Sequence, residues 1–512
     1  MSERLAQTRE EKIKKLEELR REGVEPFGAK KFVRSHKIKD IVDKFSSLNV
    51  DERRENEKVS VAGRIRSIRR HGGGGFADIE DVSGKIQLWI STGNIGEKSY
   101  SIFEKTDAGD VVGVSGYVFK TKRGELSIWV QSFTLLSKAL RPLPSSWHGL
   151  KDTETRYRQR YVDLIMNPGV KNTFFTRSRI IQGMREFLVG RGYLEVETPI
   201  LQPIYGGAFA RPFVTHHNSL DMKMYLRISN EMYLKRLIVG GLEKVFEFSP
   251  DFRNEGIDTS HNPEFTLLEA MTAYDDYKDG MDLVENLIAH ALKKALGSAK
   301  VKYQGVEIDF KVPWKRIKMV DAIKEHLGID VMKSSEQELR DYVKKRGIEV
   351  KDRAKKGELM NLVFEEFVES KLIQTTIVYE YPVEISALAK KCDGNPAFTE
   401  RFEMFIFGRE AGNNYTEIND PLELRKRFEE ELKRGKAGDD EAHPMDEDFL
   451  RAVEYGMPPT CGIGIGIDRL VMIATDSPSI RDVILFPALR ITKEELHGDE
   501  DKDRILKVNK GK

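Results

Sequence analysis

The stretch Arg253-Asn-Glu-Gly-Ile-Asp-Thr-Ser-His-Asn-Pro-Glu-Phe265 gathers a cation, an anion, an imidazole and an aromatic ring in one segment. Runs of strand-forming residues precede and follow it, so we expect a loop between two strands. A guanidinium group binds phosphate oxygens in a bidentate manner, and an aromatic face stacks on a nucleobase. The segment is therefore typical of a site for a nucleoside triphosphate.

A second segment, Gly462-Ile-Gly-Ile-Gly-Ile-Asp-Arg469, reads as a strand whose three glycines share one face. A face without side chains lets a flat ligand approach the backbone, although a glycine-rich core strand is the alternative. The spacing lacks the third glycine of the Gly-x-Gly-x-x-Gly dinucleotide fingerprint, which excludes a Rossmann site. We expect Asp468 to cap a helix from which Arg469 reaches a phosphate.

Length and composition restrict the class of protein. The chain has 512 residues, 39% of them hydrophobic, and a formal net charge of +1. No apolar run approaches the ~18 residues of a membrane-spanning helix, and the N-terminus lacks the features of a secretory signal. We therefore expect a cytoplasmic protein without a membrane role. A nucleic-acid partner would need a local basic patch, because the overall charge is nearly zero.

The two cysteines, Cys392 and Cys461, lack the paired spacing of zinc or redox motifs, so we expect both to be reduced. The glycine run at residues 72–75 lacks the Lys-Ser/Thr of a phosphate loop and is interpreted as a hairpin loop.

Short strands broken by glycine predict a small barrel in the first third of the chain. They are expected at residues 59–68, 76–80, 85–90, 111–119 and 125–136. The natural candidate is an oligonucleotide-binding (OB) barrel, whose open face carries stacking rings and polar groups. On that face we expect Phe76 to stack on a base, Gln87 and Glu125 to contact base edges, and Arg64, Arg66, Arg69 and Arg70 to lie near phosphates. The alternative is that Phe76 belongs to the core and the arginines form a solvated edge.

The remaining pattern suggests the domain layout. We expect a helical arm at residues 1–56, the barrel at 57–140, a proline-rich linker at 141–155 and a second domain at 156–512. In the second domain helices alternate with strand-like runs, and a mostly helical insertion is expected at about 312–372.

Carboxylates in strand patterns predict a site for a cation. Glu269 shares a strand face with Phe265, Leu267 and Met271, and Glu417 shares one with Asn413 and Tyr415. Together with Glu231 these carboxylates could line one cavity. Buried carboxylates need cationic partners, so a ligand with two ammonium groups is expected.

Glu403 and Glu410 flank a strongly apolar run. Magnesium bridging phosphate oxygens would be a suitable partner for them. Their odd separation places them on opposite faces of a regular strand, so this interpretation requires a bulge or a twist, for which Gly408 is the candidate.

Together these segments resemble the signature motifs of class II aminoacyl-tRNA synthetases, and in detail those of the lysyl-tRNA synthetases. The matching segments are residues 206–218, 225–236, 252–256 and 261–265, and the likeness covers almost the whole chain. The resemblance implies an α+β fold, with an N-terminal OB-fold anticodon-binding domain and a catalytic domain built on an antiparallel sheet flanked by helices. Residues 192–199 resemble the motif that forms the dimer, which implies a homodimer.

The resemblance implies ATP-dependent ligation of L-lysine to tRNA(Lys) through a lysyl-adenylate, with Mg²⁺. Arg253 would hold the α-phosphate and Arg469 the γ-phosphate as the catalytic residues. Further ATP contacts would come from Glu255, His261, Asn262 and Phe265, and from Glu403 and Glu410 through the metal. The lysine pocket would comprise Gly207, Glu231, Glu269, Met271, Asn413, Tyr415 and Glu417. A U-rich anticodon would be read by Arg69, Phe76, Gln87 and Glu125.

One residue departs from the family pattern, because Met271 stands where relatives commonly have tyrosine. Methionine fills similar space but provides no strong hydrogen bond. The alternatives are a synthetase for aspartate or asparagine, an RNA-binding protein with an inactive core, and a lysyl ligase acting on protein or lipid. An acidic pocket argues against the first, because an anionic substrate would be repelled.

Overall fold

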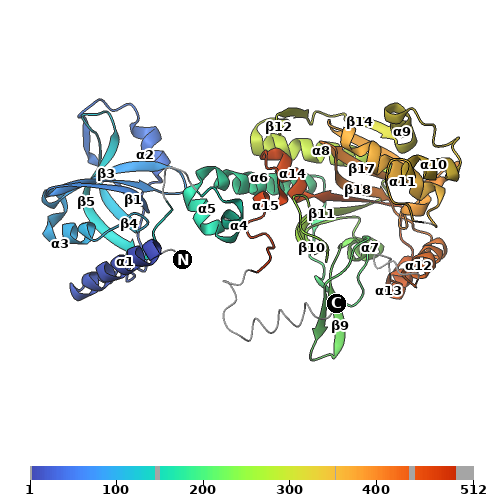
Figure 1. Ribbon diagram of the computed structural model, residues 1–512, viewed down its shortest axis with the longest axis horizontal. Helices are drawn as coiled ribbons and strands as arrows, with labels where there is room; N and C mark the ends of the chain where they lie inside the picture. The colour runs from blue at the N-terminus through green and yellow to red at the C-terminus, as the bar shows by residue number, and fades with distance from the viewer. Residues whose placement is uncertain (1–2, 145–149, 352, 437–443, 492–512) are drawn as a thin grey trace. The chain divides into compact units, whose positions relative to one another are not determined.

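The computed structural model describes residues 3–144, 150–351, 353–436 and 444–491. Residues 145–149, within the segment predicted as a linker, lie outside the described residues. The chain divides into two compact units, Met1–Lys151 and Asp152–Lys512 (Figure 1).

The first unit contains a closed barrel with the strand order β1-β2-β3-β5-β4. Its strands are β1 (Arg53–His71), β2 (Gly74–Glu80), β3 (Lys85–Ser91), β4 (Val111–Lys120) and β5 (Leu126–Ser137). Its helices are α1 (Glu3–Arg21), α2 (Ile38–Phe45) and α3 (Thr92–Glu104). The strands lie where the glycine-broken pattern predicts them, whereas α3, which has a non-helical glycine at Gly96, was not predicted.

The barrel interior is apolar. Val61, Ile79, Leu88 and Ile128 are fully buried there, and side chains of neighbouring positions alternate outward. The helix α1 adds its buried Leu19 to this core. The N-terminal helix is thus packed against the barrel as part of one unit.

The second unit is built on a mixed sheet with the order β14-β15-β17-β18-β19-β11-β10-β6, in which β16 also pairs with β17. The pairs β14/β15 and β10/β6 are parallel and the others are antiparallel. The strands are β6 (Leu194–Glu195), β10 (Lys244–Phe252), β11 (Glu264–Ala273), β14 (Lys315–Lys318), β15 (Thr376–Pro382), β16 (Lys391–Cys392), β17 (Asn395–Ile406), β18 (Arg409–Thr416) and β19 (Thr460–Gly466). Residues 253–263 therefore form the loop between β10 and β11, as expected.

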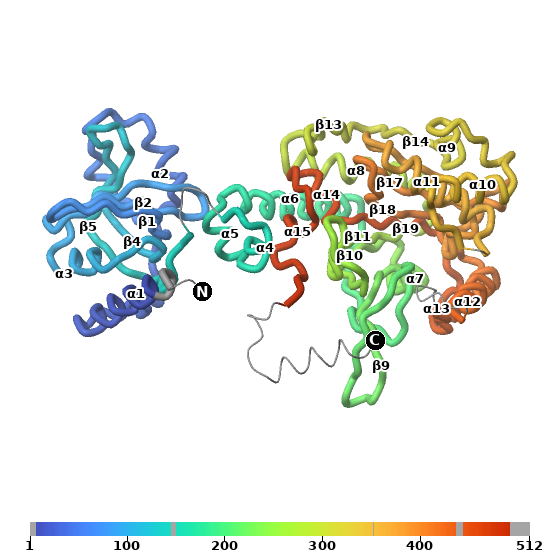
Figure 2. Tube along the Cα trace, viewed as in Figure 1, coloured from blue at the N-terminus to red at the C-terminus, as the bar shows by residue number. Residues whose placement is uncertain are grey.

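One face of this sheet is covered by α6 (Pro168–Gly190), α8 (Tyr277–Leu296) and α14 (Ile467–Ala474), and α6 and α8 lie side by side (Figure 2). Leu268 and Ala270 of β11 point into the core beneath these helices. Because side chains alternate along a strand, their neighbours Leu267, Glu269 and Met271 point to the opposite face. The opposite face of the sheet is not covered by these helices and is therefore available for a functional site.

The stretch 312–372 contains β14, α9 (Met319–Leu327), α10 (Glu336–Lys344) and α11 (Lys356–Phe367), whose buried side chains form a separate apolar cluster. The remaining helices are α4 (Thr153–Arg158), α5 (Arg160–Met166), α7 (Glu231–Val239), α12 (Pro421–Lys436), α13 (Glu447–Glu454), α15 (Ile480–Val483), η1 (Glu369–Lys371) and η2 (Val383–Ile385). The remaining strands are β7 (Leu201–Gln202), β8 (Val214–His217), β9 (Met222–Leu226), β12 (Lys300–Tyr303) and β13 (Val306–Asp309).

Among the described residues, no helix is long and apolar enough to cross a membrane. Cys392 and Cys461 are both free thiols, and Cys461 is buried.

Candidate active site

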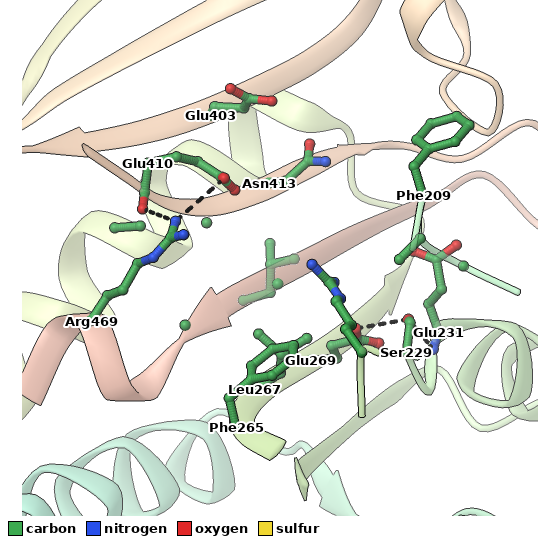
Figure 3. Close-up of a pocket in the computed structure, with 18 of the residues that line it drawn as sticks. Phe209, Ser229, Glu231, Phe265, Leu267, Glu269, Glu403, Glu410, Asn413 and Arg469 are labelled. Atoms are coloured by element: carbon green, nitrogen blue, oxygen red, sulfur yellow. Dashed lines mark hydrogen bonds and ion pairs between the residues drawn. The ribbon is translucent and has the colours of Figure 1, made fainter. Parts of the chain in front are cut away.

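A cavity of about 730 Å³ lies on the face of the sheet that α6 and α8 leave open. Its walls come from β11, β17, β18 and β19, from the loop after β10 and from the start of α7. In Figure 3, Glu403, Glu410 and Arg469 gather at one end, and Ser229, Glu231 and Glu269 gather at the other. The cavity therefore has two chemically distinct ends.

Arg253 and Phe265 face each other across the β10–β11 loop. The guanidinium carbon of Arg253 lies 5.0 Å from the centre of the Phe265 ring. Its Nε is buried, and within the described chain it has no hydrogen-bond partner. A buried donor without a partner is costly, so this group is set up to receive an anion from a ligand.

Arg469 lies in the first turn of α14, beside His261. Its Nη1 donates to the Glu410 carbonyl oxygen at 2.6 Å, and its Nη2 lies 3.5 Å from Nε2 of His261. Asp258 orients the imidazole through a 2.9 Å contact with Nδ1. Burial alone would raise the pKa of Asp258. Hydrogen bonds from His261 and Ser260 have the larger combined effect, and the pKa is lowered to about 2. Asp258 thus stays ionised and fixes the ring next to Arg469.

Asp468 does not cap α14, contrary to the sequence prediction. The helix begins at Ile467, so Gly466 is the capping position and Asp468 lies inside the first turn. Its carboxylate accepts a hydrogen bond from the Thr266 amide at 2.7 Å and pairs with Arg177 at 2.5 Å. Asp468 therefore fixes α14 to β11, and this holds Arg469 in place.

Two further residues of the loop after β10 line the cavity in different ways. Asn262 is buried, donates to the Glu264 carbonyl at 2.5 Å and accepts from the Ala488 amide at 3.1 Å. Its side chain thus holds the loop. Glu255 is exposed at the cavity rim.

Glu403 and Glu410 line the cavity from two strands of a hairpin. The expectation that they lie on one strand with an irregularity at Gly408 is wrong. The hairpin turns at Phe407 and Gly408, both of which have positive φ, and the register shift lies where Met404 pairs with Gly412 and the next residue, Phe405, pairs with Glu410. The hairpin was hidden because the turn itself contains an apolar aromatic residue.

Glu403 is held by protein partners. Its carboxylate pairs with Arg401 at 2.5 Å and accepts a hydrogen bond from the Tyr381 hydroxyl at 2.9 Å. Burial raises the pKa of Glu403 to about 7 despite Arg401. Arg401 also donates to Asn413 Oδ1 at 3.0 Å, which orients that amide in the cavity.

At the other end of the cavity, Glu231 and Glu417 share an internal partner. The ammonium of Lys235, which is 1% exposed, lies 2.9 Å from Glu231 Oε1 and 2.7 Å from Glu417 Oε2. The second oxygen of Glu231 accepts from the Tyr415 hydroxyl at 2.7 Å. Lys235 was not predicted, and it pairs with two of these carboxylates before any ligand binds. The spacing of Glu231 and Lys235, four residues apart on a helix, was the available signal.

Two carboxylate oxygens at this end keep free acceptor capacity. Ser229 donates to Glu269 Oε1 at 2.9 Å, whereas Glu269 Oε2 and Glu417 Oε1 are buried and have no hydrogen-bond partner among the described residues. Burial, reinforced by nearby acids, raises the pKa of Glu269 well above its ordinary value. Burial likewise raises the pKa of Glu417 to about 8, although Lys235 opposes this. Such oxygens favour a cationic ligand.

Glycines shape the same end. Gly207 has φ +90°, and a Cβ atom there would lie 2.5 Å from the Cγ of Glu231. Gly462 lies beneath Glu417 and Met271, so part of the bare glycine face is used by the protein's own side chains. The more open part lies at Gly466, where a Cβ would meet nothing closer than 3.7 Å.

The barrel strands carry a row of aromatic side chains outside the barrel core, of which Phe76, Trp89 and Trp129 are half-buried and Tyr117 is buried. Phe76, Trp89, Trp129 and Tyr117 are successive cross-strand partners, with ring-centre distances of 4.6, 6.3 and 5.9 Å. None of them belongs to the barrel core cluster. Trp89 and Trp129 were not predicted as part of this row, although the alternation of side chains along β3 and β5 places them on the same side.

Polar residues predicted on the barrel face have different surroundings. Arg69 is exposed and pairs across the strands with Phe76, Gln87 accepts from Ser127 at 3.1 Å, and Glu125 is exposed. The expectation that Arg64, Arg66 and Arg70 bind phosphates is not supported, because Arg64 and Arg70 donate to backbone carbonyls of the barrel and Arg66 pairs with Glu80 at 3.1 Å.

Each of the two units matches a known protein family. The family model described as tRNA synthetases class II (D, K and N) matches residues 152–490, and the model described as OB-fold nucleic acid binding domain matches residues 59–136. A lysine–tRNA ligase of Bacillus subtilis (strain 168) is 54% identical over 478 residues, which cover 93% of this chain and 96% of the relative. The enzymes of the same name from Thermoanaerobacter pseudethanolicus and Carboxydothermus hydrogenoformans are 56% and 54% identical, over 93% and 94% of this chain and 94% and 97% of the relatives.

Proposed function

Because the chain belongs to the lysine–tRNA ligase family of class II aminoacyl-tRNA synthetases, we propose that its cavity activates L-lysine with ATP and passes it to the 3′-hydroxyl of tRNA(Lys). The main support for this assignment is that both anionic and cationic groups line the cavity and lack partners within the described chain. Unpartnered carboxylate oxygens of Glu269 and Glu417 lie at one end, and the unpartnered Nε of Arg253 borders the same cavity beside Phe265, as far as the described residues show. A ligand with two ammonium groups and a phosphate-bearing co-substrate satisfies both ends.

The first step joins two anions, the lysine carboxylate and the α-phosphate of ATP. The carboxylate oxygen attacks the α-phosphorus, the bond to the bridging oxygen breaks, and pyrophosphate leaves. Arg253 would neutralise the α-phosphate and Arg469, with His261 beside it, the γ-phosphate, so that charge in the transition state meets fixed cations. Phe265 would stack on adenine. In the second step the tRNA 3′-hydroxyl attacks the lysyl carbonyl and AMP leaves.

The family depends on ATP and a metal, and we propose magnesium held by Glu403 and Glu410. The donor set fits, because magnesium is commonly bound by one or two carboxylates together with substrate phosphates. When bound, the ion would neutralise phosphate charge. The pairing of Glu403 with Arg401 keeps that carboxylate in the cavity.

In the lysine pocket we propose that the α-amino end lies beside Gly207 and Glu231 and donates to Oε2 of Glu269, and that Oε1 of Glu417 receives the side-chain ammonium, both oxygens being without a partner among the described residues. Glu269, Met271, Asn413 and Tyr415 would complete the walls, all of which line the cavity.

For tRNA, we propose that the aromatic row of the barrel binds the anticodon. Phe76 would stack on a base, Gln87 and Glu125 would contact base edges, and Arg69 would contact a phosphate. Trp89 and Trp129 extend the same row.

We also propose a cytoplasmic homodimer. Leu194, Ile200, Leu201 and Val214 of the region around β6 to β8 are each at least 41% exposed, and exposed apolar residues in one region mark an interaction surface. Sedimentation analysis tests this, with a mass of two chains expected and a single-chain mass contradicting it.

The test of the function is pyrophosphate exchange with each amino acid in turn. We expect exchange with lysine and none with aspartate or asparagine, whose side chains cannot satisfy Glu269 and Glu417. Exchange that is fastest with aspartate or asparagine would favour the other members of this class, and absence of exchange with every amino acid would indicate an inactive core.

A further inference from the structure

The environment of Lys235 suggests a role beyond packing. This lysine projects from α7 and places its ammonium between the carboxylates of Glu231 and Glu417, over the ring of Tyr415 at 5.3 Å from its centre. Its donors are thus directed at two carboxylates and one aromatic face. Since a lysine ammonium has three donors and no acceptor, this residue has little capacity left for a substrate.

The charges at this end of the cavity are informative. Glu231, Glu269 and Glu417 bring three carboxylates, and lysine as a substrate would bring two ammonium groups. With both ammonium groups bound and Lys235 absent, one carboxylate would be buried without a counter-ion, which is costly. With Lys235 present, three carboxylates meet three ammonium groups.

The number of carboxylate oxygens at this end of the cavity without a partner among the described residues equals the number of ammonium groups on lysine. Lys235 binds one oxygen of Glu231 and one oxygen of Glu417, and Tyr415 and Ser229 donate to further oxygens of Glu231 and Glu269. Within the described chain this leaves Glu269 Oε2 and Glu417 Oε1 unpartnered, one oxygen for each ammonium group of the substrate.

We propose that Lys235 is a positioning residue for amino-acid recognition: it acts as a built-in third ammonium that orients Glu417 and favours its ionised form when the substrate binds. This inference rests on the proposed lysine pocket. Lys235 itself would not contact the reacting atoms, and its effect would be confined to the affinity for lysine.

The groups around Glu417 allow the effect of pH to be stated. Glu417 faces Lys235 and Glu231 from α7, Tyr415 from β18 and Cys461 from β19, and Tyr415 in turn lies near Glu269 of β11. Lys235 is the cation of this set. Its removal would therefore raise the pKa of Glu417 further and move lysine binding to higher pH.

The test compares Lys235→Met with the wild-type enzyme in pyrophosphate exchange between pH 6 and 9. We expect the KM for lysine to rise by about tenfold or more at pH 7, the change given by loss of one hydrogen bond to a charged group. We also expect the pH at which lysine binding is half-maximal to rise, and the KM for ATP to stay within twofold. Lys235→Arg, which keeps the charge, should leave the pH midpoint in place.

Two controls keep the outcome interpretable. Lys300→Met removes another lysine of the catalytic unit, from an exposed ion pair with Glu307, and should change nothing. If Lys235→Met does not fold, Lys235→Gln retains a donor without the charge and is expected to show the same shift in pH. An unchanged KM for lysine and pH midpoint in a folded variant would overturn the proposal, as would an equal loss of ATP affinity. Failure of the proposed function would differ, because the wild-type enzyme would then show no exchange with lysine.

Discussion

Glu417 and Gly462 lie in such close contact that Oε1 of Glu417 is 2.5 Å from the point where a Cβ atom on Gly462 would be. Met271 Sδ lies 2.9 Å from the same point. Since Gly462 belongs to a central strand paired on both sides, the backbone has little freedom to move away. The glycine thus permits the orientation in which Glu417 meets the substrate.

A methyl group at this position would displace the carboxylate. We therefore predict that Gly462→Ala raises the KM for lysine by about tenfold, with little change in the KM for ATP. Gly169→Ala is the matched control, because a Cβ there meets nothing within 4 Å. Steady-state pyrophosphate exchange measures both, and an unchanged KM for lysine in Gly462→Ala would contradict the proposed position of the substrate.

Arg253 is the residue proposed to bind the α-phosphate of ATP. We predict that Arg253→Ala lowers the rate of exchange by about 100-fold or more, the effect of losing one fixed group that stabilises transition-state charge. Arg253→Lys should recover only part of this rate, because an ammonium cannot bind phosphate in a bidentate manner. Near-normal turnover of Arg253→Ala would remove this residue from the mechanism.

Lysine binding should depend on pH. Burial raises the pKa of Glu417 to about 8, so the folded protein holds this proton more tightly than the unfolded chain does. The stability that this adds is present at low pH and is lost as the pH rises towards 8.

A protonated Glu417 attracts a cation weakly, so we predict that the KM for lysine falls between pH 6.5 and 8.5 and that lysine binding releases protons. Calorimetry in buffers of different ionisation enthalpy measures the release, and proton uptake would contradict the prediction.

Met271 is the residue at which the sequence departs from the pattern expected of the synthetase family it resembles. The cavity borders this side chain, so a tyrosine ring could extend towards Glu417 and offer a hydroxyl. We predict that Met271→Tyr lowers the KM for lysine by up to about tenfold. Met271→Leu keeps the volume without a hydroxyl and should stay within about twofold. A higher KM in the tyrosine variant would show that methionine is required here.

The aromatic row of the barrel can be tested separately from amino-acid activation. We predict that Trp89→Ala raises the KM for tRNA in aminoacylation by roughly tenfold, since stacking contributes ~1–3 kcal/mol per base. Pyrophosphate exchange without tRNA should be unaffected. If tRNA affinity does not change, the row has a structural role only.

Much of the fold follows from local patterns. The barrel strands were predictable because glycine and alternating apolar residues mark their ends and faces, and the shared face of Glu269 and Met271 follows from the two-residue period of β11. The loop after β10 was recognisable because it concentrates unusual residue types.

The rest depends on tertiary contacts that local patterns do not contain. The pairing of Lys235 with Glu417 joins residues far apart in sequence, and Asp468 contacts Thr266 and Arg177 where a cap was expected. The turn at Phe407 and Gly408 was obscured by its apolar surroundings. In each case the prediction from the local sequence pattern failed because a contact formed only in the folded chain determines the structure.

The most direct test of the account is a crystal structure of the protein with lysine and ATP bound. We predict that Glu417 Oε1 and Glu269 Oε2 each lie within hydrogen-bonding distance of a lysine nitrogen, and that Arg253 contacts the α-phosphate. A lysine whose side-chain ammonium points to solvent, with both of these oxygens still unpartnered, would contradict it.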